Sequence, residues 1–149
     1  MAFEIVSHSV DETISLGRRI GEQLKGGEII GLVGTLGTGK THLIKGIAAG
    51  LGSVDLRNVN SPTFVIINEY RGGRLDVFHI DAYRLESIAE FEMLGFDDYC
   101  YADSVVMIEW ADKIERALAG LEIIRIELSH CGPNDRTIRI TSLPVYIGL

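Results

Sequence analysis

Eight consecutive residues, Gly34 to Thr41, have the types and spacing most clearly suited to chemistry. They fit the pattern G-x-x-x-x-G-K-[ST] and read Gly34-Thr35-Leu36-Gly37-Thr38-Gly39-Lys40-Thr41. Glycines let a backbone curl until successive N–H groups point at one anion. A lysine after them brings a charge to the β- and γ-phosphates of a nucleotide, and the next hydroxyl is a ligand for Mg²⁺. The segment therefore predicts a site for Mg²⁺-ATP.

The flanking residues predict the elements that position this loop. Residues 28–33 form a short apolar run that indicates a buried strand. Residues 42–51 indicate a helix with Leu43, Ile47 and Leu51 on one face, and its dipole would add positive potential at the loop. The order of strand, glycine loop and helix is the context that this motif requires.

Two acids follow apolar strands further along the chain. Glu109 comes directly after the apolar residues 105–108, and Asp81 ends a strand predicted over 75–81. A phosphate-binding loop needs such a carboxylate to hold Mg²⁺ or to orient water. We therefore predict Lys40, Asp81 and Glu109 as catalytic residues. His79 lies on the same face as Asp81 and has either a chemical role or a structural one, as a partner of Asp81 or part of the core.

Three further features have two interpretations each. The segment 61–63, Ser-Pro-Thr, is either a switch that senses the γ-phosphate or a turn that starts a strand. Arg84 is either an arginine finger or a member of a structural ion pair. Trp110 is either a core or interface anchor or a platform on which the base stacks.

The remaining pattern indicates an α/β fold, with a P-loop NTPase-like sheet, helices on both faces and antiparallel hairpin strands, in one domain over 1–149. We expect an edge strand at 3–6, a helix from the N-cap Ser9 to about Lys25, and close packing at its glycines 17 and 21. Residues 53–60 are predicted as a polar connection. Strands 64–70 and 75–81 form a hairpin with a two-residue turn at Gly72-Gly73.

Short helices are expected at 86–94 and 111–118. The sequence predicts a second antiparallel pair at 121–128 and 136–141.

Composition limits the possible partners. The 149 residues carry a net charge of −7 and have no run of Lys or Arg, so tight direct binding of tRNA or DNA is not expected. No apolar run is long enough for a membrane span, and the first residues do not resemble a secretory signal. Cys100 and Cys131 match no metal spacing, which suits a cytoplasmic protein.

Five motifs in this order resemble the TsaE (YjeE) family of small bacterial P-loop ATPases. The match covers nearly the whole chain and consists of Gly34-x-Leu36-Gly37-x-Gly39-Lys40-Thr41, Ser61-Pro62-Thr63-Phe64, His79-x-Asp81-x-Tyr83-Arg84-Leu85, Glu92-x-Leu94-Gly95 and Ile108-Glu109-Trp110. The family loop usually has Asp at position 35 and Ala at position 38, where this chain has threonines.

The resemblance implies an ATPase that acts on the TsaD–TsaB protein complex during threonylcarbamoyladenosine modification of tRNA. Thr41 and Glu109 would hold Mg²⁺, and Asp81 would serve hydrolysis. The segments 9–13 and 134–136 would close around the adenine. The residues expected to bind the nucleotide are Gly34, Leu36, Gly37, Thr38, Gly39, Lys40, Thr41 and His42.

Three other functions share the loop motif. A small nucleotide or nucleoside kinase needs a lid with several arginines, for which the chain has little room. A GTPase needs an [NT]-K-x-D motif, which residues 112–115 do not supply. A module that binds ATP without hydrolysing it would differ only in its turnover.

Overall fold

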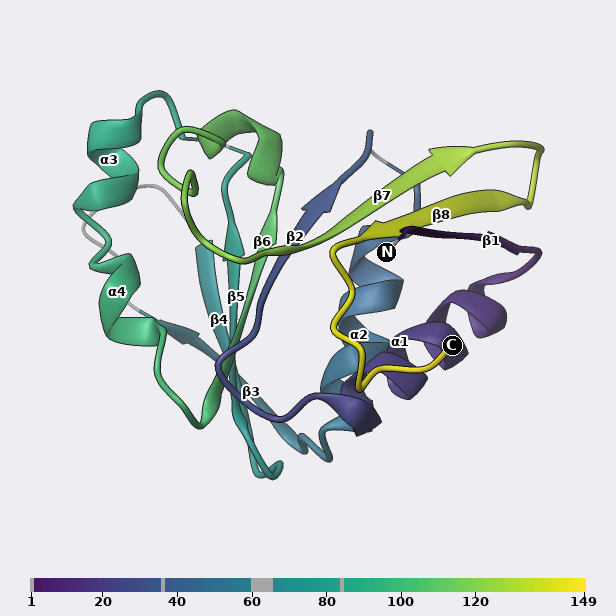
Figure 1. The fold of residues 1–149 in the computed structure, drawn as a ribbon, viewed down its shortest axis with the longest axis horizontal. Helices are drawn as coiled ribbons and strands as arrows, with labels where there is room; N and C mark the ends of the chain where they lie inside the picture. The colour runs from purple at the N-terminus through teal and green to yellow at the C-terminus, as the bar shows by residue number, and fades with distance from the viewer. Residues whose placement is uncertain (1, 36, 60–65, 84) are drawn as a thin grey trace.

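A mixed sheet of eight strands runs through the computed structural model, which describes residues 2–35, 37–59, 66–83 and 85–149 (Figure 1). The strand order is β1-β8-β7-β2-β6-β5-β4-β3. Strands β7, β2, β6 and β5 are parallel neighbours, and antiparallel strands extend the sheet on both sides. The strands are β1 Ala2–Ser7, β2 Ile29–Val33, β3 Asp55–Val59, β4 Ile66–Arg71, β5 Asp76–Asp81, β6 Ser104–Glu109, β7 Ile124–His130 and β8 Arg136–Thr141.

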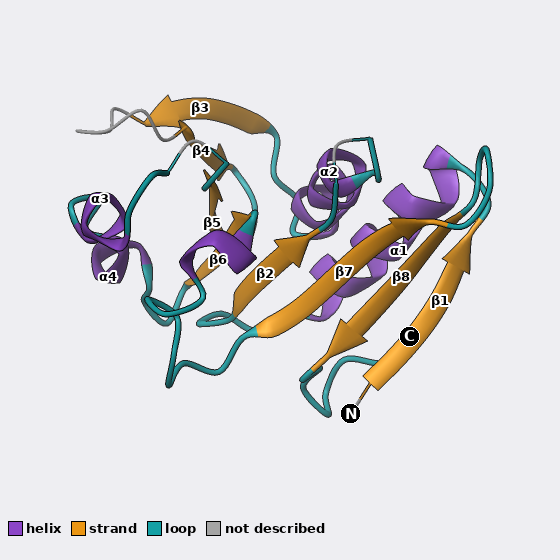
Figure 2. Cartoon of the chain, turned by 90° about the horizontal axis from the view of Figure 1, so that it is seen from above, coloured by secondary structure: helices purple, strands orange, loops and turns teal. Residues whose placement is uncertain are grey.

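Helices cover both faces of this sheet, as the sequence predicts. Helices α1 (Val10–Gln23) and α2 (Lys40–Gly50) lie on one face (Figure 2). The short helices α3 (Ile88–Glu92) and α4 (Phe96–Tyr99) and the 3₁₀ helix η1 (Ala111–Ile114) lie on the other. We call these the α1–α2 face and the α3–α4 face.

Strand β6 shows why both faces of the sheet must be covered. All six of its residues are buried, and alternate side chains belong to different hydrophobic clusters. Val105 and Met107 pack with α1 and α2, whereas Val106 and Ile108 pack with the α3–α4 face. A strand buried on both faces reads as a continuous apolar run, which is how the sequence presents it.

Helices α1 and α2 approach each other until their backbones touch. The approach uses a pair of glycines four residues apart on each helix, Gly17 and Gly21 on α1 and Gly46 and Gly50 on α2. A Cβ atom built on Gly46 would lie 2.3 Å from the carbonyl oxygen of Ile14. A Cβ atom on Gly17 would lie 2.4 Å from that of Leu43. The close packing expected at the α1 glycines is confirmed, and it fixes the start of α1 beside the glycine loop.

Two predictions around the hairpin were wrong. Residues 55–59 form the edge strand β3, paired antiparallel with β4, within the stretch predicted as a polar connection. The hairpin turn spans the four residues 72–75, because the loop binds neighbouring helices. The Arg74 backbone N–H donates to the Leu51 carbonyl oxygen at 3.0 Å, and its guanidinium donates to that of Gly21 at 2.7 Å.

The helices of the α3–α4 face are shorter than predicted. The predicted helix at 86–94 is helical only over α3, and Gly95, at φ 69°, begins the unpredicted α4. The predicted helix at 111–118 forms only the 3₁₀ turn η1, followed by turns up to Gly120. Helix α1 begins at the predicted N-cap, where Ser9 Oγ accepts from the Glu12 N–H at 3.1 Å, and ends at Gln23.

Candidate functional site

The glycine loop connects the end of β2 to the start of α2. Gly37 and Gly39 have φ angles of 80° and 97°, a region that other residues rarely adopt. Thr38 is buried, and its hydroxyl donates to the Thr35 carbonyl oxygen at 2.7 Å. Because α2 begins at Lys40, the positive end of its dipole lies at the loop. The backbone therefore has the geometry that the motif predicts for an anion site.

Lys40 is 6% exposed and lies against the loop that precedes it. Its ammonium donates to the carbonyl oxygens of Gly34 and Thr35 and lies 3.7 Å from the centroid of the Trp110 ring. Burial lowers the pKa of Lys40, and the negative charges of Glu109 and other nearby acids oppose that shift. The one cation of the loop is therefore held next to the acidic end of the sheet.

The two predicted acids lie on adjacent strands. Strands β5 and β6 are parallel, and Asp81 pairs in register with Glu109. Both carboxylates therefore reach the same edge of the sheet. The Glu109 carboxylate is nearly buried and lies 3.0 Å from His79 Nε2, while Asp81 Oδ1 accepts from the Tyr83 N–H at 3.0 Å.

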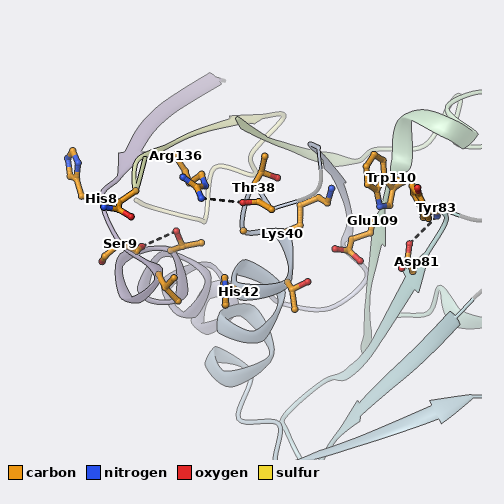
Figure 3. A pocket seen from close by; sticks show the side chains of 16 residues that line it. His8, Ser9, Thr38, Lys40, His42, Asp81, Tyr83, Glu109, Trp110 and Arg136 are labelled. Carbon is orange, nitrogen blue, oxygen red and sulfur yellow. Dashed lines mark hydrogen bonds between the residues drawn. The ribbon is translucent and has the colours of Figure 1, made fainter. Parts of the chain in front are cut away.

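A cleft of about 680 Å³ brings the loop and the acids together. In Figure 3, Lys40 lies between Glu109 and Asp81 on one side and His8, Ser9 and Arg136 on the other. The predicted residues that line the cleft are Gly37, Thr38, Gly39, Lys40, Thr41, His42, Asp81 and Glu109. Gly34 does not line it but accepts from Lys40. Leu36, Arg84 and the segment 61–63 lie outside the described residues.

The far wall of the cleft comes from the start of α1 and the turn between β7 and β8. Ser9, Val10 and Thr13 line it on the first side, and Asn134 and Arg136 on the second. These are the two segments expected near an adenine.

Contacts between distant parts of the chain join this wall to the loop and its two sides to each other. Arg136 Nη2 donates to the Gly37 carbonyl oxygen at 3.2 Å, and His8 Nδ1 lies 3.0 Å from Asp135 Oδ1. The hydrogen bond with Asp135 raises the pKa of His8.

The chain matches one family model over residues 7–138, that of the threonylcarbamoyl adenosine biosynthesis protein TsaE. The chain belongs to the TsaE family. It is 41% identical over 133 residues to the TsaE protein of Bacillus subtilis, covering 89% of this chain and 81% of the relative. The TsaE protein of Aquifex aeolicus is 33% identical, with 92% of this chain and 94% of the relative covered.

A solved structure, that of YdiB from Bacillus subtilis, superposes with a TM-score of 0.74 at 30% identity. The match covers 94% of this chain and 84% of YdiB. The predicted family and fold class are therefore confirmed.

Two cleft residues of this TsaE chain were not predicted to line a site. Tyr83 and His8 both do so. The centroid of the Tyr83 ring lies 4.9 Å from that of Trp110, with the two rings tilted by 49°, so Trp110 contacts both Tyr83 and the Lys40 ammonium. Tyr83 stands two residues after the predicted site residue Asp81, so its place in the sequence could have marked it as a candidate. Nothing in the sequence links His8 to Asp135, which follows it by 127 positions.

The cleft offers oxygen ligands of the kind that Mg²⁺ prefers. Thr41 brings an exposed hydroxyl, and Glu109 a carboxylate whose one hydrogen bond to the described residues is to His79. Those residues contain no group of three or more His, Cys, Asp or Glu placed to hold a metal. Mg²⁺ binds through one or two protein ligands plus phosphates and water, so this sparse set fits it.

Within the described part of the chain, no helix has the length and apolar character to cross a membrane.

Proposed function

We propose that this TsaE chain is a Mg²⁺-dependent ATPase that supports N6-threonylcarbamoyladenosine modification of tRNA by acting on the TsaD–TsaB complex. One observation carries the proposal. A glycine loop, its lysine and two strand-end carboxylates line one cleft, in a chain whose relatives are named for threonylcarbamoyladenosine biosynthesis.

The loop and Lys40 would bind the phosphates. Backbone N–H groups of residues 37–41 and the start of α2 favour a bound anion. Lys40 would exchange its contacts with the Gly34 and Thr35 carbonyl oxygens for the β- and γ-phosphates, which are stronger partners for an ammonium. The same contacts hold the Lys40 side chain in place before a nucleotide binds.

The two carboxylates would have different roles, one in binding Mg²⁺ and the other in orienting water. Thr41 and Glu109 would hold Mg²⁺, which neutralises charge on the β- and γ-phosphates when it is bound. Asp81 is less buried than Glu109, and the Tyr83 N–H fixes one of its oxygens. Its other oxygen would orient the attacking water.

A protein is a better direct partner than tRNA. The chain carries a net charge of −7, which repels a polyanion at long range. Binding of nucleotide would change the surface around the cleft, and a partner that reads that surface would respond to hydrolysis. We place the TsaD–TsaB complex in that role.

The test is ATP turnover and modified-nucleoside formation by the purified chain, with and without TsaD–TsaB and tRNA. We expect slow turnover alone, faster turnover with TsaD–TsaB, and no modification when this chain is omitted. TsaD–TsaB capture by the immobilised chain should require a non-hydrolysable ATP analogue and fail with ADP. Capture that ignores the nucleotide, or micromolar binding of free tRNA at physiological salt, contradicts the proposal.

A further inference from the structure

His79, on β5, is a buried histidine that the proposed reaction leaves without a role. It is 8% exposed, and its Nε2 lies 3.0 Å from Glu109 Oε2. Its Nδ1 is buried without a hydrogen-bond partner in the described part of the chain. The ring therefore has one polar contact there, and that contact is to a proposed Mg²⁺ ligand.

The direction of this hydrogen bond follows from the donor inventory. An ionised carboxylate only accepts, so the Nε2 of His79 must carry the proton that it shares with Glu109. His79 is a donor aimed at Glu109, and the carboxylate stays available as a ligand.

The strand register shows why Glu109 needs such a donor. Glu109 stands opposite Asp81 on the neighbouring parallel strand, and two like charges at facing positions repel each other. His79 lies two residues before Asp81 on the same face of β5. It pairs in register with Met107, two residues before Glu109. The hydrogen bond therefore runs diagonally between the strands and fixes one carboxylate oxygen on the side opposite the facing position of Asp81.

We propose that His79 is a positioning residue for magnesium, which holds Glu109 Oε2 so that the other carboxylate oxygen meets the ion. The inference rests on the proposed function, because it takes Glu109 as a Mg²⁺ ligand. A histidine that only filled the core would be replaceable by a side chain without the donor. Partners behind a metal ligand typically affect metal affinity by tenfold or more.

Calorimetry of ATP binding, with and without Mg²⁺, tests the inference on the whole chain. Glutamine places an amide N–H near the position of histidine Nε2, whereas asparagine reaches only to that of Nδ1. We expect His79→Ala and His79→Asn to reduce the Mg²⁺-dependent gain in ATP affinity about tenfold. His79→Gln should retain the gain to within about threefold, and all three should bind metal-free ATP like the wild type.

Circular dichroism and thermal midpoints monitor folding, and His130→Gln is the matched control outside the cleft. Should His79→Ala fail to fold, the Gln–Asn pair decides. The inference is overturned if His79→Gln and His79→Asn show equal Mg²⁺-dependent gains in ATP affinity, or if a folded His79→Ala shows the wild-type gain. Either result leaves the proposed function intact. A wild type that binds no ATP, or binds it without regard to Mg²⁺, overturns the proposed nucleotide or metal site and the inference with it.

Discussion

The two faces of the sheet are covered by different kinds of element. On the α1–α2 face lie helices of 14 and 11 residues whose backbones touch through four glycines. On the α3–α4 face lie helices of five and four residues and a four-residue 3₁₀ turn, packed through aromatic side chains such as Phe91 and Phe96. Both faces bury a continuous hydrophobic cluster, so they differ in the length of the helices that cover them rather than in whether they are buried.

The candidate chemistry belongs to the α1–α2 face. His79, Asp81 and Glu109 alternate with residues that point to the other cluster, and Lys40 begins α2. Among the described residues, the α3–α4 side contributes to the cleft through the segments that follow β5 and β6, which carry Tyr83 and Trp110. Groups that must hold a fixed geometry thus lie on the longer, more closely packed elements, and the shorter ones support the sheet from behind.

The largest effect is expected from Lys40 on the α1–α2 face. Lys40→Ala removes the charge that would meet the β- and γ-phosphates, so ATP affinity should fall by about a hundredfold or more. Calorimetry measures the affinity, and circular dichroism should stay native. The control is Lys45→Ala, an exposed lysine on the same helix. If the two variants bind ATP equally well, the phosphate site is elsewhere.

The two acids should have smaller and separable effects. Asp81→Asn should slow turnover about tenfold and leave ATP binding nearly intact, because a water-orienting group acts mainly in the transition state. Glu109→Gln should raise the Mg²⁺ concentration needed for half-maximal turnover about tenfold.

The matched control for both is Asp97→Asn, an exposed acid on α4. The Asp81 assignment fails if Asp81→Asn stays within about threefold of wild-type turnover, roughly 0.7 kcal/mol of barrier. The Glu109 assignment fails if Glu109→Gln reaches half-maximal turnover at the same Mg²⁺ concentration as the wild type.

Core substitutions on the two faces of the sheet should also differ in their effect on ATP affinity. Gly46→Ala places a methyl group 2.3 Å from the Ile14 carbonyl oxygen, so we expect about 2 kcal/mol less unfolding free energy. ATP affinity should fall as well, because α1 carries part of the cleft wall. Phe91→Leu, on α3, should cost about 1 kcal/mol and leave ATP affinity unchanged.

Chemical denaturation and calorimetry give the two readouts. Gly132→Ala is the control for an added methyl group, since its nearest neighbour would lie at an ordinary 3.4 Å. If Phe91→Leu lowers ATP affinity as strongly as Gly46→Ala does, the α1–α2 face is not more closely linked to the cleft than the α3–α4 face.

The smallest effect concerns the pair that joins the start of α1 to the β7–β8 turn. Asp135 raises the pKa of His8, with a smaller contribution from Glu12. The charged pair therefore stabilises the fold below about pH 6.5, and the contribution is lost as pH rises through the raised pKa.

His8 is exposed, so we expect the wild type to lose about one degree more of thermal midpoint than His8→Gln between pH 5.5 and pH 8. Identical pH profiles for the two proteins would show that the pair adds nothing to stability.

The local parts of the site could be predicted from the sequence. The glycine loop, the helix after it and the apolar strand before Glu109 each depend on neighbouring residues, and their periodicity is unambiguous. The Ser9 cap is local as well. Motif order then indicated the family, although the two threonines at positions 35 and 38 depart from its usual loop.

What the sequence did not predict depends on contacts between distant residues. Strand β3 has the polar sequence Asp-Leu-Arg-Asn-Val and is held by pairing with β4. The longer hairpin turn follows from the bonds of Arg74 to α1. The contact of Arg136 with the loop spans 99 positions and exists only because the sheet order places the β7–β8 turn there.

The order in which the strands are made sets when the nucleotide cleft can form. Strand β2 is synthesised early, but both of its neighbours in the sheet, β6 and β7, begin at residues 104 and 124. A ribosome-bound chain that ends at β5 therefore carries the complete glycine loop with neither of the strands that flank β2. Nucleotide binding should begin only after β7 has left the exit tunnel, because the strand that carries the loop lacks both of its neighbours before then.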